Sequence, residues 1–300
     1  MHPVLQELNR RISGQEPQHP LVLIGEGGGM RGIQQAAALW ALNQAGATRA
    51  FDQVWAVSAA ACNAAYFLSG QSDQVGRIYS ELLSGYKTHH QFTNPLLRKP
   101  RPLEIAMSYG VQTFAPLDIE AVFKNPTSLH IGAVDLYSGR IHYFGKGNDP
   151  DKLITRIRAS SQVPTISGPP VRVGSREYLD GGLADPIPIR VLDEQKDALA
   201  VVLHTWPADH PSQIASSWLR FVQGAMLHAF HPELVGYHRS WISRRMKARH
   251  KLQRLEGAGR VYNWFPPEPL SPTCTNGTLL RRAWYTSLQS AQGHFSQLGV

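Results

Sequence analysis

Two strand–turn–helix units follow one another in the first seventy residues of the chain. The apolar run 21–24 ends in a glycine cluster, and apolar residues then recur at helical spacing over 33–41. The next unit has a short apolar run at 54–56, a serine at the turn and a helical apolar face over 61–68. A chain that alternates strands and helices in this way is expected to form a parallel sheet with helices packed against it. The sequence therefore predicts the α/β class.

Further strands are expected downstream. Two apolar runs, 129–134 and 141–144, flank a glycine-containing turn, and a second hairpin is expected over 171–179. Residues 199–203 predict another buried strand, and the pattern beyond Pro211 is mainly helical. No linker or change in composition divides the chain, so we expect one domain. Its expected parts are an N-terminal segment (residues 1–19), a main domain (residues 20–205) and a mostly helical C-terminal extension packed on the same domain (residues 206–300).

The chain is basic, with 30 Lys and Arg against 22 Asp and Glu and a formal net charge of +8. Such a charge favours an anionic partner, such as a phospholipid surface or a nucleic acid, without distinguishing between them. Much of the excess lies in residues 240–260. The first interpretation of this basic segment is a solvated helix face. The second is peripheral contact with an anionic membrane surface, aided by apolar residues within 218–230.

The chain carries no obvious targeting or disulfide pattern. The most apolar run, residues 54–68, is too short to cross a bilayer, and the first twenty residues lack a signal-peptide pattern. We therefore expect a cytoplasmic protein. The two cysteines, Cys62 and Cys274, provide neither a disulfide framework nor Cys-based metal spacing, and are expected to be small core residues.

A glycine-rich loop separates the first expected strand from its helix. It consists of Gly27, Gly28, Gly29, Met30, Arg31 and Gly32. Glycines let the backbone turn sharply and present N–H groups at a helix N-terminus, which suits an anion. The spacing also fits a dinucleotide-binding pattern, but the acid that would bind the ribose, Asp52, precedes the second strand instead of ending it. The stronger hypothesis is an oxyanion hole, in which N–H groups hold the negative oxygen of a tetrahedral intermediate.

Ser58 lies at the turn between a buried strand and an alanine-rich helix, which is the position of a nucleophile elbow. Such a turn holds the serine in a strained backbone conformation and exposes its hydroxyl. The usual pattern is G-x-S-x-G, whereas the segment here is Ala56-Val57-Ser58-Ala59-Ala60, with alanine at both glycine positions. On this motif alone, a serine that caps the following helix is the default interpretation.

The third motif, Asp180-Gly181-Gly182, follows an expected hairpin, and in isolation is a common turn. An aspartate within hydrogen-bond reach of a serine can act as its base without a histidine. None of the thirteen histidines falls in these three motifs. His204, after the strand at 199–203, is the best candidate for a triad histidine, although a surface or structural role is the preferred interpretation.

Taken together and in this order, the three motifs resemble the patatin-like phospholipase family, whose pattern is G-G-G-x-R-G, then G-x-S-x-G, then D-G-G or D-G-A. The segments LVLIGEGGGMRG, IRASSQVP at 157–164 and YLDGGLADPIPI at 178–189 are also similar to that family. The resemblance covers about residues 20–205. Glu26 before the glycine loop and the segment FPPEPL at 265–270 resemble a bacterial subgroup of the family.

This resemblance implies a three-layer α/β/α patatin-like fold with a mainly parallel central sheet and a helical C-terminal extension. It also implies hydrolysis of lipid or other carboxylic esters, without metal or organic cofactor and with no nucleic-acid partner. Ser58 would be the nucleophile, Asp180 the general base, and the N–H groups around Gly28 and Gly29 the oxyanion donors. Arg31 would assist the loop, bind a lipid phosphate or pin the loop to the sheet.

The departure from the family pattern is at Ala56 and Ala60. If each alanine occupied a positive-φ or crowded position, the strain would be about 1–2 kcal/mol per site, or roughly a tenfold rate loss apiece. Such a loss slows an enzyme without abolishing its activity, so we favour a slow or specialised hydrolase. The alternative is a catalytically impaired patatin-fold protein that binds a lipid or a protein partner.

Overall fold

The computed structural model describes residues 1–84, 105–163, 167–209 and 235–299. Pro164 and the apolar residues within 218–230, to which the sequence drew attention, lie outside these ranges. The helices are α1 (Pro3–Ile12), α2 (Gly32–Gln44), α3 (Ala59–Leu68), α4 (Ser72–Arg77), α7 (Ile119–Lys124), α8 (Pro150–Ser160), α9 (Val191–Glu194), α11 (Val235–Gly257) and α12 (Gly277–Phe295), with π-helical segments at Ile78–Leu82 and Ile105–Phe114. The strands are β1 (Leu21–Gly25), β2 (Gln53–Val57), β3 (Ser128–Asp135), β4 (Ile141–Gly145), β5 (Val171–Val173), β6 (Arg176–Asp180), β7 (Leu199–Leu203) and β8 (Val261–Trp264).

The strands form one eight-stranded mixed sheet in the order β5-β6-β3-β2-β1-β7-β8, with β4 also paired to β3. Its centre is parallel, since β1 pairs in parallel with both β2 and β7, and the pairs β2–β3 and β7–β8 are parallel too. The two expected hairpins, β3–β4 and β5–β6, are antiparallel. Since β3 and β6 are also antiparallel, β6 brings its C-terminal residue Asp180 opposite Ala133.

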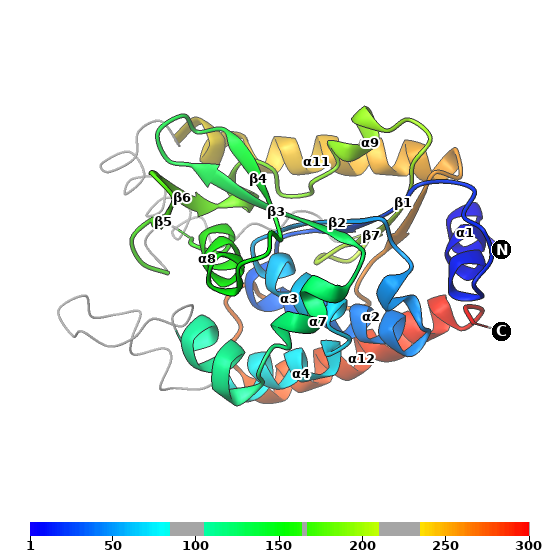
Figure 1. Cartoon of the computed structure of the whole chain (residues 1–300), viewed down its shortest axis with the longest axis horizontal. Helices are drawn as coiled ribbons and strands as arrows, with labels where there is room; N and C mark the ends of the chain where they lie inside the picture. The colour runs from blue at the N-terminus through cyan, green and yellow to red at the C-terminus, as the bar shows by residue number, and fades with distance from the viewer. Residues whose placement is uncertain (85–104, 164–166, 210–234, 300) are drawn as a thin grey trace.

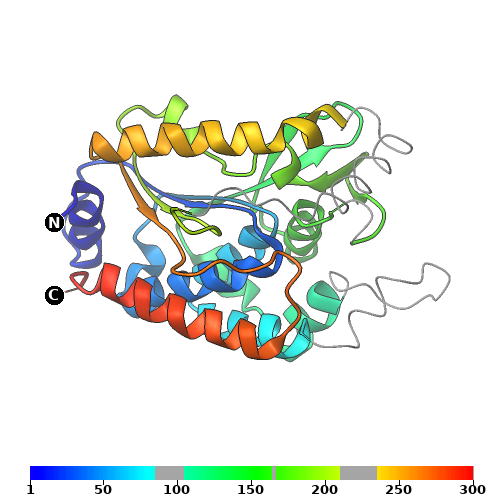
Figure 2. The same cartoon turned by 180° about the vertical axis from the view of Figure 1, so that it is seen from behind.

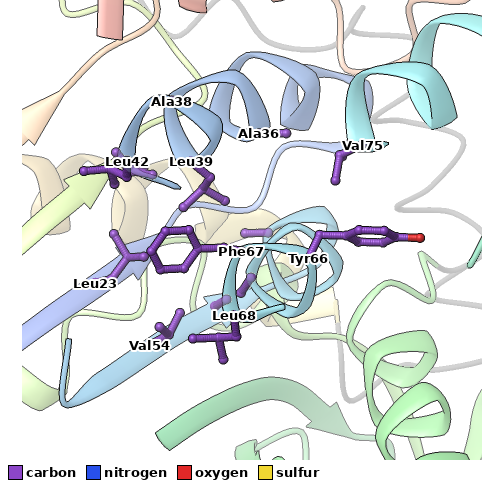
Figure 3. Packing of buried hydrophobic residues seen from close by; sticks show 14 of the residues in the cluster. Leu23, Ala36, Ala38, Leu39, Leu42, Val54, Tyr66, Phe67, Leu68 and Val75 are labelled. Carbon is purple, nitrogen blue, oxygen red and sulfur yellow. The ribbon is translucent and has the colours of Figure 1, made fainter. Parts of the chain in front are cut away.

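The central strands are buried on both faces, which explains their continuous apolar sequences. In β1, Leu21 and Leu23 pack into the core beneath α2 and α3, whereas Val22 and Ile24 pack into the core on the other face. Figure 3 shows the first core, where Leu23 lies close to Phe67 of α3. Alternation of side chains along a strand places β1 between two cores, so its position in the sheet is strongly determined.

Helices cover both faces of the sheet, so the fold has three layers, as the sequence analysis predicted (Figure 1). Helices α9 and α11 lie on one face, and α2, α3 and α7 on the other. Helix α12 packs along α2 on the outer side of that second layer.

Both ends of the chain take part in this arrangement. The C-terminal extension adds strand β8 to the edge of the sheet and helix α12 to a helical layer. Figure 2 shows the two termini at the same end of the molecule, where the N–H of Gly299 donates to Asn9 Oδ1 over 2.8 Å. Within the described ranges, no helix is long and apolar enough to cross a membrane.

Candidate active site

Ser58 connects β2 to α3 in a strained conformation. Its φ of 58° and ψ of −137° lie outside the regions that L-residues normally adopt, and it is the only non-glycine residue with positive φ in the described part of the chain. The Ser58 N–H donates to Ser160 Oγ over 2.9 Å, and Ser160 Oγ donates to the carbonyl of Gly132 over 2.6 Å. The elbow is therefore fastened to β3 by a serine at the end of α8.

Asp180, at the end of β6, accepts a hydrogen bond from the Ser58 hydroxyl. Ser58 Oγ and Asp180 Oδ2 are 2.6 Å apart, although 122 positions separate the two residues in sequence. The other carboxylate oxygen accepts from the N–H of Gly182 over 2.7 Å, which fixes the orientation of the group. Burial raises the pKa of Asp180 to about 6, and the hydrogen bonds from Ser58 and Gly182 offset part of that rise. The carboxylate is thus ionised at neutral pH and aimed at the serine.

The turn after Asp180 requires glycine because it runs against β3. A Cβ atom at Gly181 would collide with the carbonyl oxygen of Gly132. At Gly182, a Cβ would lie 3.0 Å from Asp180 Oδ1. These two glycines let the chain turn sharply while the carboxylate keeps its hydrogen bond.

The two elbow alanines do not carry the backbone strain that the sequence analysis considered. Neither Ala56, in β2, nor Ala60, in α3, has a positive φ. Room for the Ala60 methyl group comes from Gly25 at the end of β1, where a Cβ would lie 2.9 Å from Ala60 Cβ. The same Cβ would lie 3.6 Å from Ala56 Cβ, which is an ordinary contact distance. Of the two conditions that the sequence analysis considered, positive φ occurs at neither alanine, and crowding at Ala60 is avoided by a glycine on a neighbouring strand.

The other two elbow residues also meet glycines. A Cβ at Gly132 would lie 2.7 Å from Val57 Cγ1, and a Cβ at Gly32 would lie 3.1 Å from Ala59 Cβ. The elbow is thus packed closely on both sides, against β3 and against the start of α2.

The glycine loop, residues 27–32, passes beside the serine. A Cβ at Gly27 would lie 3.2 Å from Ser58 Cβ. Several N–H groups of the loop have backbone acceptors: Gly27 donates to Pro186 O, Met30 to Pro272 O and Arg31 to Gly28 O. The N–H groups of Gly28 and Gly29 have no acceptor among the residues that the structure describes. The loop that passes beside Ser58 therefore contains two adjacent N–H groups free to bind an anion, the type of donor from which an oxyanion hole is built.

A hydrogen-bond network on α2 and α3 fixes the loop relative to the elbow. Asn63, five residues after the serine, donates to the carbonyl of Gly32 over 2.9 Å. Gln35 donates to the carbonyls of Glu26 and Leu203 over 3.2 and 3.0 Å. The sequence analysis missed both residues because polar side chains on a buried helix face have no signal in a linear pattern.

Glu26, immediately before the loop, is the centre of a buried polar cluster. Its carboxylate, 1% exposed, accepts from the N–H of Thr205 over 2.9 Å and from Arg245 Nε over 2.5 Å, and lies 3.2 Å from His204 Nδ1. Burial raises the pKa of Glu26, but the positive charge of Arg245 and the hydrogen bonds outweigh burial and hold the pKa well below its usual range. Glu26 is therefore a permanently charged anchor under the loop.

His204 belongs to this cluster and not to a catalytic triad. Its Nε2 lies 3.0 Å from Asn263 Oδ1, its Nδ1 faces Glu26, and its ring stacks on Phe265 at 4.2 Å between centroids. Because both ring nitrogens are engaged and the residue is fully buried, the structural interpretation of His204 holds.

Arg31 is buried as well, with 4% of its surface exposed. Its guanidinium lies 4.1 Å from the centroid of the Trp206 ring, and its Nε and Nη1 have no hydrogen-bond partner in the described ranges. Burial, reinforced by the nearby charge of Arg245, lowers the pKa of Arg31 to about 9 in spite of the opposing effect of Glu26. The side chain therefore packs under the loop against an indole ring.

The first interpretation of the basic segment was a solvated helix face. In the structure this part of α11 is only partly exposed. Arg245 is 2% exposed and Arg249 7% exposed, whereas Lys247 and Arg254 point to solvent. The expectation is wrong for the two buried arginines because each finds partners inside the protein: Arg245 binds Glu26, and Arg249 donates to the carbonyls of Pro207 and Ala208.

Both cysteines pack against the hydrophobic core. Cys62 lies in α3, where burial raises the pKa of its thiol to about 12, and Cys274 packs partly buried against the core. Among the described residues, no group of three or more His, Cys, Asp or Glu side chains could hold a metal ion.

Comparison with known proteins gives three findings. A family model described as patatin-like phospholipase matches residues 23–193, more than half of the chain. The uncharacterized protein YjjU of Escherichia coli (strain K12) is 26% identical over 258 residues, which cover 83% of this chain and 69% of YjjU. The crystal structure of VipD from Legionella pneumophila is 12% identical, with a TM-score of 0.44 over 93% of this chain and 67% of VipD.

Proposed function

Because this chain belongs to the patatin-like phospholipase family, we propose that it is a serine hydrolase that cleaves carboxylic esters of lipids with Ser58 and Asp180. Family membership by itself implies an ester hydrolase acting on lipids in general terms. The observation that carries the specific proposal is the 2.6 Å hydrogen bond from the strained Ser58 to the buried carboxylate of Asp180.

In the acylation step, Ser58 Oγ attacks the ester carbonyl carbon as its proton moves to Asp180 Oδ2. The carbonyl oxygen becomes negative and accepts hydrogen bonds from the N–H groups of Gly28 and Gly29. Donors of this kind are worth about 10²–10³ in kcat each, because they are fixed before the charge develops. The carbon–oxygen bond to the leaving alcohol then breaks, and Asp180 returns the proton to the departing oxygen.

Deacylation repeats these steps with water. Asp180, again ionised, takes a proton from a water molecule whose oxygen attacks the acyl carbon on Ser58. The same two N–H groups hold the second oxyanion. When the bond to Ser58 Oγ breaks, the proton on Asp180 returns to the serine, and a free carboxylic acid leaves. A base with a pKa of about 6 suits both directions of this transfer near neutral pH.

The elbow geometry favours an active enzyme over the impaired, lipid-binding alternative. The alternative was motivated by Ala56 and Ala60, but both have ordinary backbone conformations and Gly25 makes room for the Ala60 methyl group. Ser58 keeps the positive φ that an elbow imposes.

The test is reaction of the purified protein with a fluorescent organophosphonate, followed by p-nitrophenyl ester hydrolysis across acyl chain lengths. We expect wild type to label and hydrolyse, Ser58→Ala to do neither, and Asp180→Asn to lose hydrolysis. Asp185→Asn is the matched control: burial also raises the pKa of Asp185 to about 6, but its partner is the Tyr143 hydroxyl, at 2.6 Å. A wild type that neither labels nor hydrolyses, yet binds fatty acid or phospholipid, would establish the impaired alternative.

We also propose a cytoplasmic enzyme that touches anionic membrane surfaces peripherally. The buried state of Arg245 and Arg249 leaves less charge for this contact than the sequence suggested, with Lys247 and Arg254 exposed on α11. Co-sedimentation with vesicles should increase with anionic lipid content and decrease with salt. Binding that ignores anionic lipid would remove this part of the proposal.

A further inference from the structure

We propose that the C-terminal extension completes the active site, with Arg245 of α11 as a positioning residue for the glycine loop. This inference rests on the proposed function, since it concerns the same site. Arg245 touches no reacting atom and acts through Glu26, while a second connection runs through residues 265–272, named here the C-terminal strap. The extension lies beyond the residues 23–193 that the family model matches.

The first connection is the buried ion pair between Arg245 and Glu26. The two side chains are 2% and 1% exposed, and 219 positions separate them in sequence. Glu26 directly precedes Gly27, and its Oε2 also holds the N–H of Thr205, whose hydroxyl donates to the carbonyl of Gly27 over 3.1 Å. Arg245 thus determines where the carboxylate lies, and the carboxylate determines where the loop begins.

The second connection is the C-terminal strap, which crosses the other end of the loop. The N–H of Met30 donates to the carbonyl of Pro272 over 3.0 Å. Gln34, in the first turn of α2, donates to the carbonyl of Glu268 over 2.8 Å. Gly29 has a φ of 56°, and a Cβ there would lie 2.7 Å from the Pro272 oxygen, so the strap lies directly against the loop.

The unpaired donors of Gly28 and Gly29 lie between these two connections. Oxyanion donors are effective only when they are about 2.7–3.1 Å from the developing charge, and a misplacement of about 1 Å can cost roughly 100-fold in rate. The loop's glycines cannot fix their own backbone conformation, since glycine is the most permissive residue. Contacts from α11 and the strap therefore set the donor positions on both sides.

The experiment compares Arg245→Met with Lys247→Met, which removes an exposed charge from the same helix. Each protein is titrated with the fluorescent organophosphonate to count reactive Ser58 sites, and ester hydrolysis is then measured per labelled site. For Arg245→Met we expect full labelling at a slower rate, a kcat per site about 100-fold lower, and a KM within about threefold of wild type. Lys247→Met should match wild type in all three.

Two further variants keep the inference testable if Arg245→Met does not fold. Arg245→Lys preserves the charge opposite Glu26 but loses the Nε donor, and should lower kcat per labelled site by about tenfold, less than the loss expected for Arg245→Met. Gln34→Leu cuts the bond from α2 to the strap without touching the ion pair, and should also lower kcat per labelled site more than it raises KM.

The outcomes separate this inference from the function on which it rests. A purely structural role for Arg245 would reduce the number of sites that label but leave kcat per labelled site unchanged, and that result would overturn the inference alone. Wild-type kcat in both Arg245→Lys and Gln34→Leu would overturn it as well. A wild type that neither labels nor hydrolyses would overturn the proposed function, and the inference with it.

Discussion

Gly25→Ala tests whether Gly25 of β1 provides the space for the Ala60 methyl group that a glycine in the elbow would otherwise provide. The new Cβ would lie 2.9 Å from Ala60 Cβ, whereas carbon atoms in contact are normally about 3.5–4.0 Å apart. Both methyl groups are on backbone in regular structure, β1 and α3, so neither can rotate away. The overlap of at least roughly 0.6 Å must be relieved by moving the strand or the elbow.

The expected cost follows from overpacking. Insertion of a methyl into a close-packed core costs about 1–3 kcal/mol, and the lower entropy of an unfolded alanine chain returns about 0.4–1 kcal/mol. We therefore expect Gly25→Ala to lower the free energy of unfolding by about 1–2 kcal/mol. Because the strain falls on Ala60, two residues after Ser58, part of it should appear in the barrier, at roughly tenfold in kcat for each 1.4 kcal/mol.

A double-mutant cycle with Ala60→Gly isolates the contact. Ala60→Gly alone should destabilise by about 2 kcal/mol, because a helix glycine costs about 1 kcal/mol and a buried methyl about 0.8 kcal/mol. In the double variant the new methyl at position 25 occupies the space vacated at position 60, so the two effects should not add. We expect a favourable coupling of roughly 2 kcal/mol in urea unfolding, together with recovery of kcat per labelled site. Additive effects, or a Gly25→Ala protein that unfolds at the wild-type urea concentration, would show that Gly25 does not make room for the Ala60 methyl group.

Three further predictions concern the same site. Burial raises the pKa of Asp180 to about 6, and a protonated carboxyl cannot take the Ser58 proton. We therefore expect kcat/KM to fall about tenfold per pH unit below pH 6 and to level off above it. A flat profile between pH 5 and 7 would contradict Asp180 as the base. Ser160→Ala leaves the Ser58 N–H without its acceptor and should lower the free energy of unfolding, measured in urea, by about 1–3 kcal/mol. An unchanged urea midpoint of unfolding would refute the role of Ser160 in fastening the elbow. Cys62 is partly buried, and burial raises the pKa of its thiol to about 12, so iodoacetamide at pH 8 should alkylate it far more slowly in the native protein than after unfolding. Equal rates of modification before and after unfolding, read by mass spectrometry, would contradict this.

Much of the sheet could be predicted because its evidence is local. The apolar run of β1 alternates between two cores, and the strand–turn–helix repeat leaves a parallel arrangement as the simplest solution. Ser58 and Asp180 could be proposed as a pair only through the order of the motifs, because nothing in their neighbourhoods shows that residues 122 positions apart meet at 2.6 Å.

The contacts of α11 could not be predicted, and the reason is physical. A run of arginines and lysines fixes the charge of a helix but not which of its cations find an internal partner. Arg245 is buried because Glu26, 219 positions earlier, needs a counter-charge under the glycine loop. A buried carboxylate without such a partner would be strongly destabilising, so the pair is expected to persist or be lost together.

The alanines of the elbow show what the G-x-S-x-G pattern requires. Only the serine has a positive φ, while Ala56 has strand geometry and Ala60 helical geometry, so neither position needs the conformational freedom of glycine. What Ala60 needs is space where the elbow meets β1. That space can be left by an elbow residue without a side chain or by the strand residue opposite it, and in this chain Gly25 leaves it. A departure from the motif is therefore uninformative about activity until the residue facing it has been identified, and a chain with alanine two residues after the serine should carry glycine at the end of its first strand.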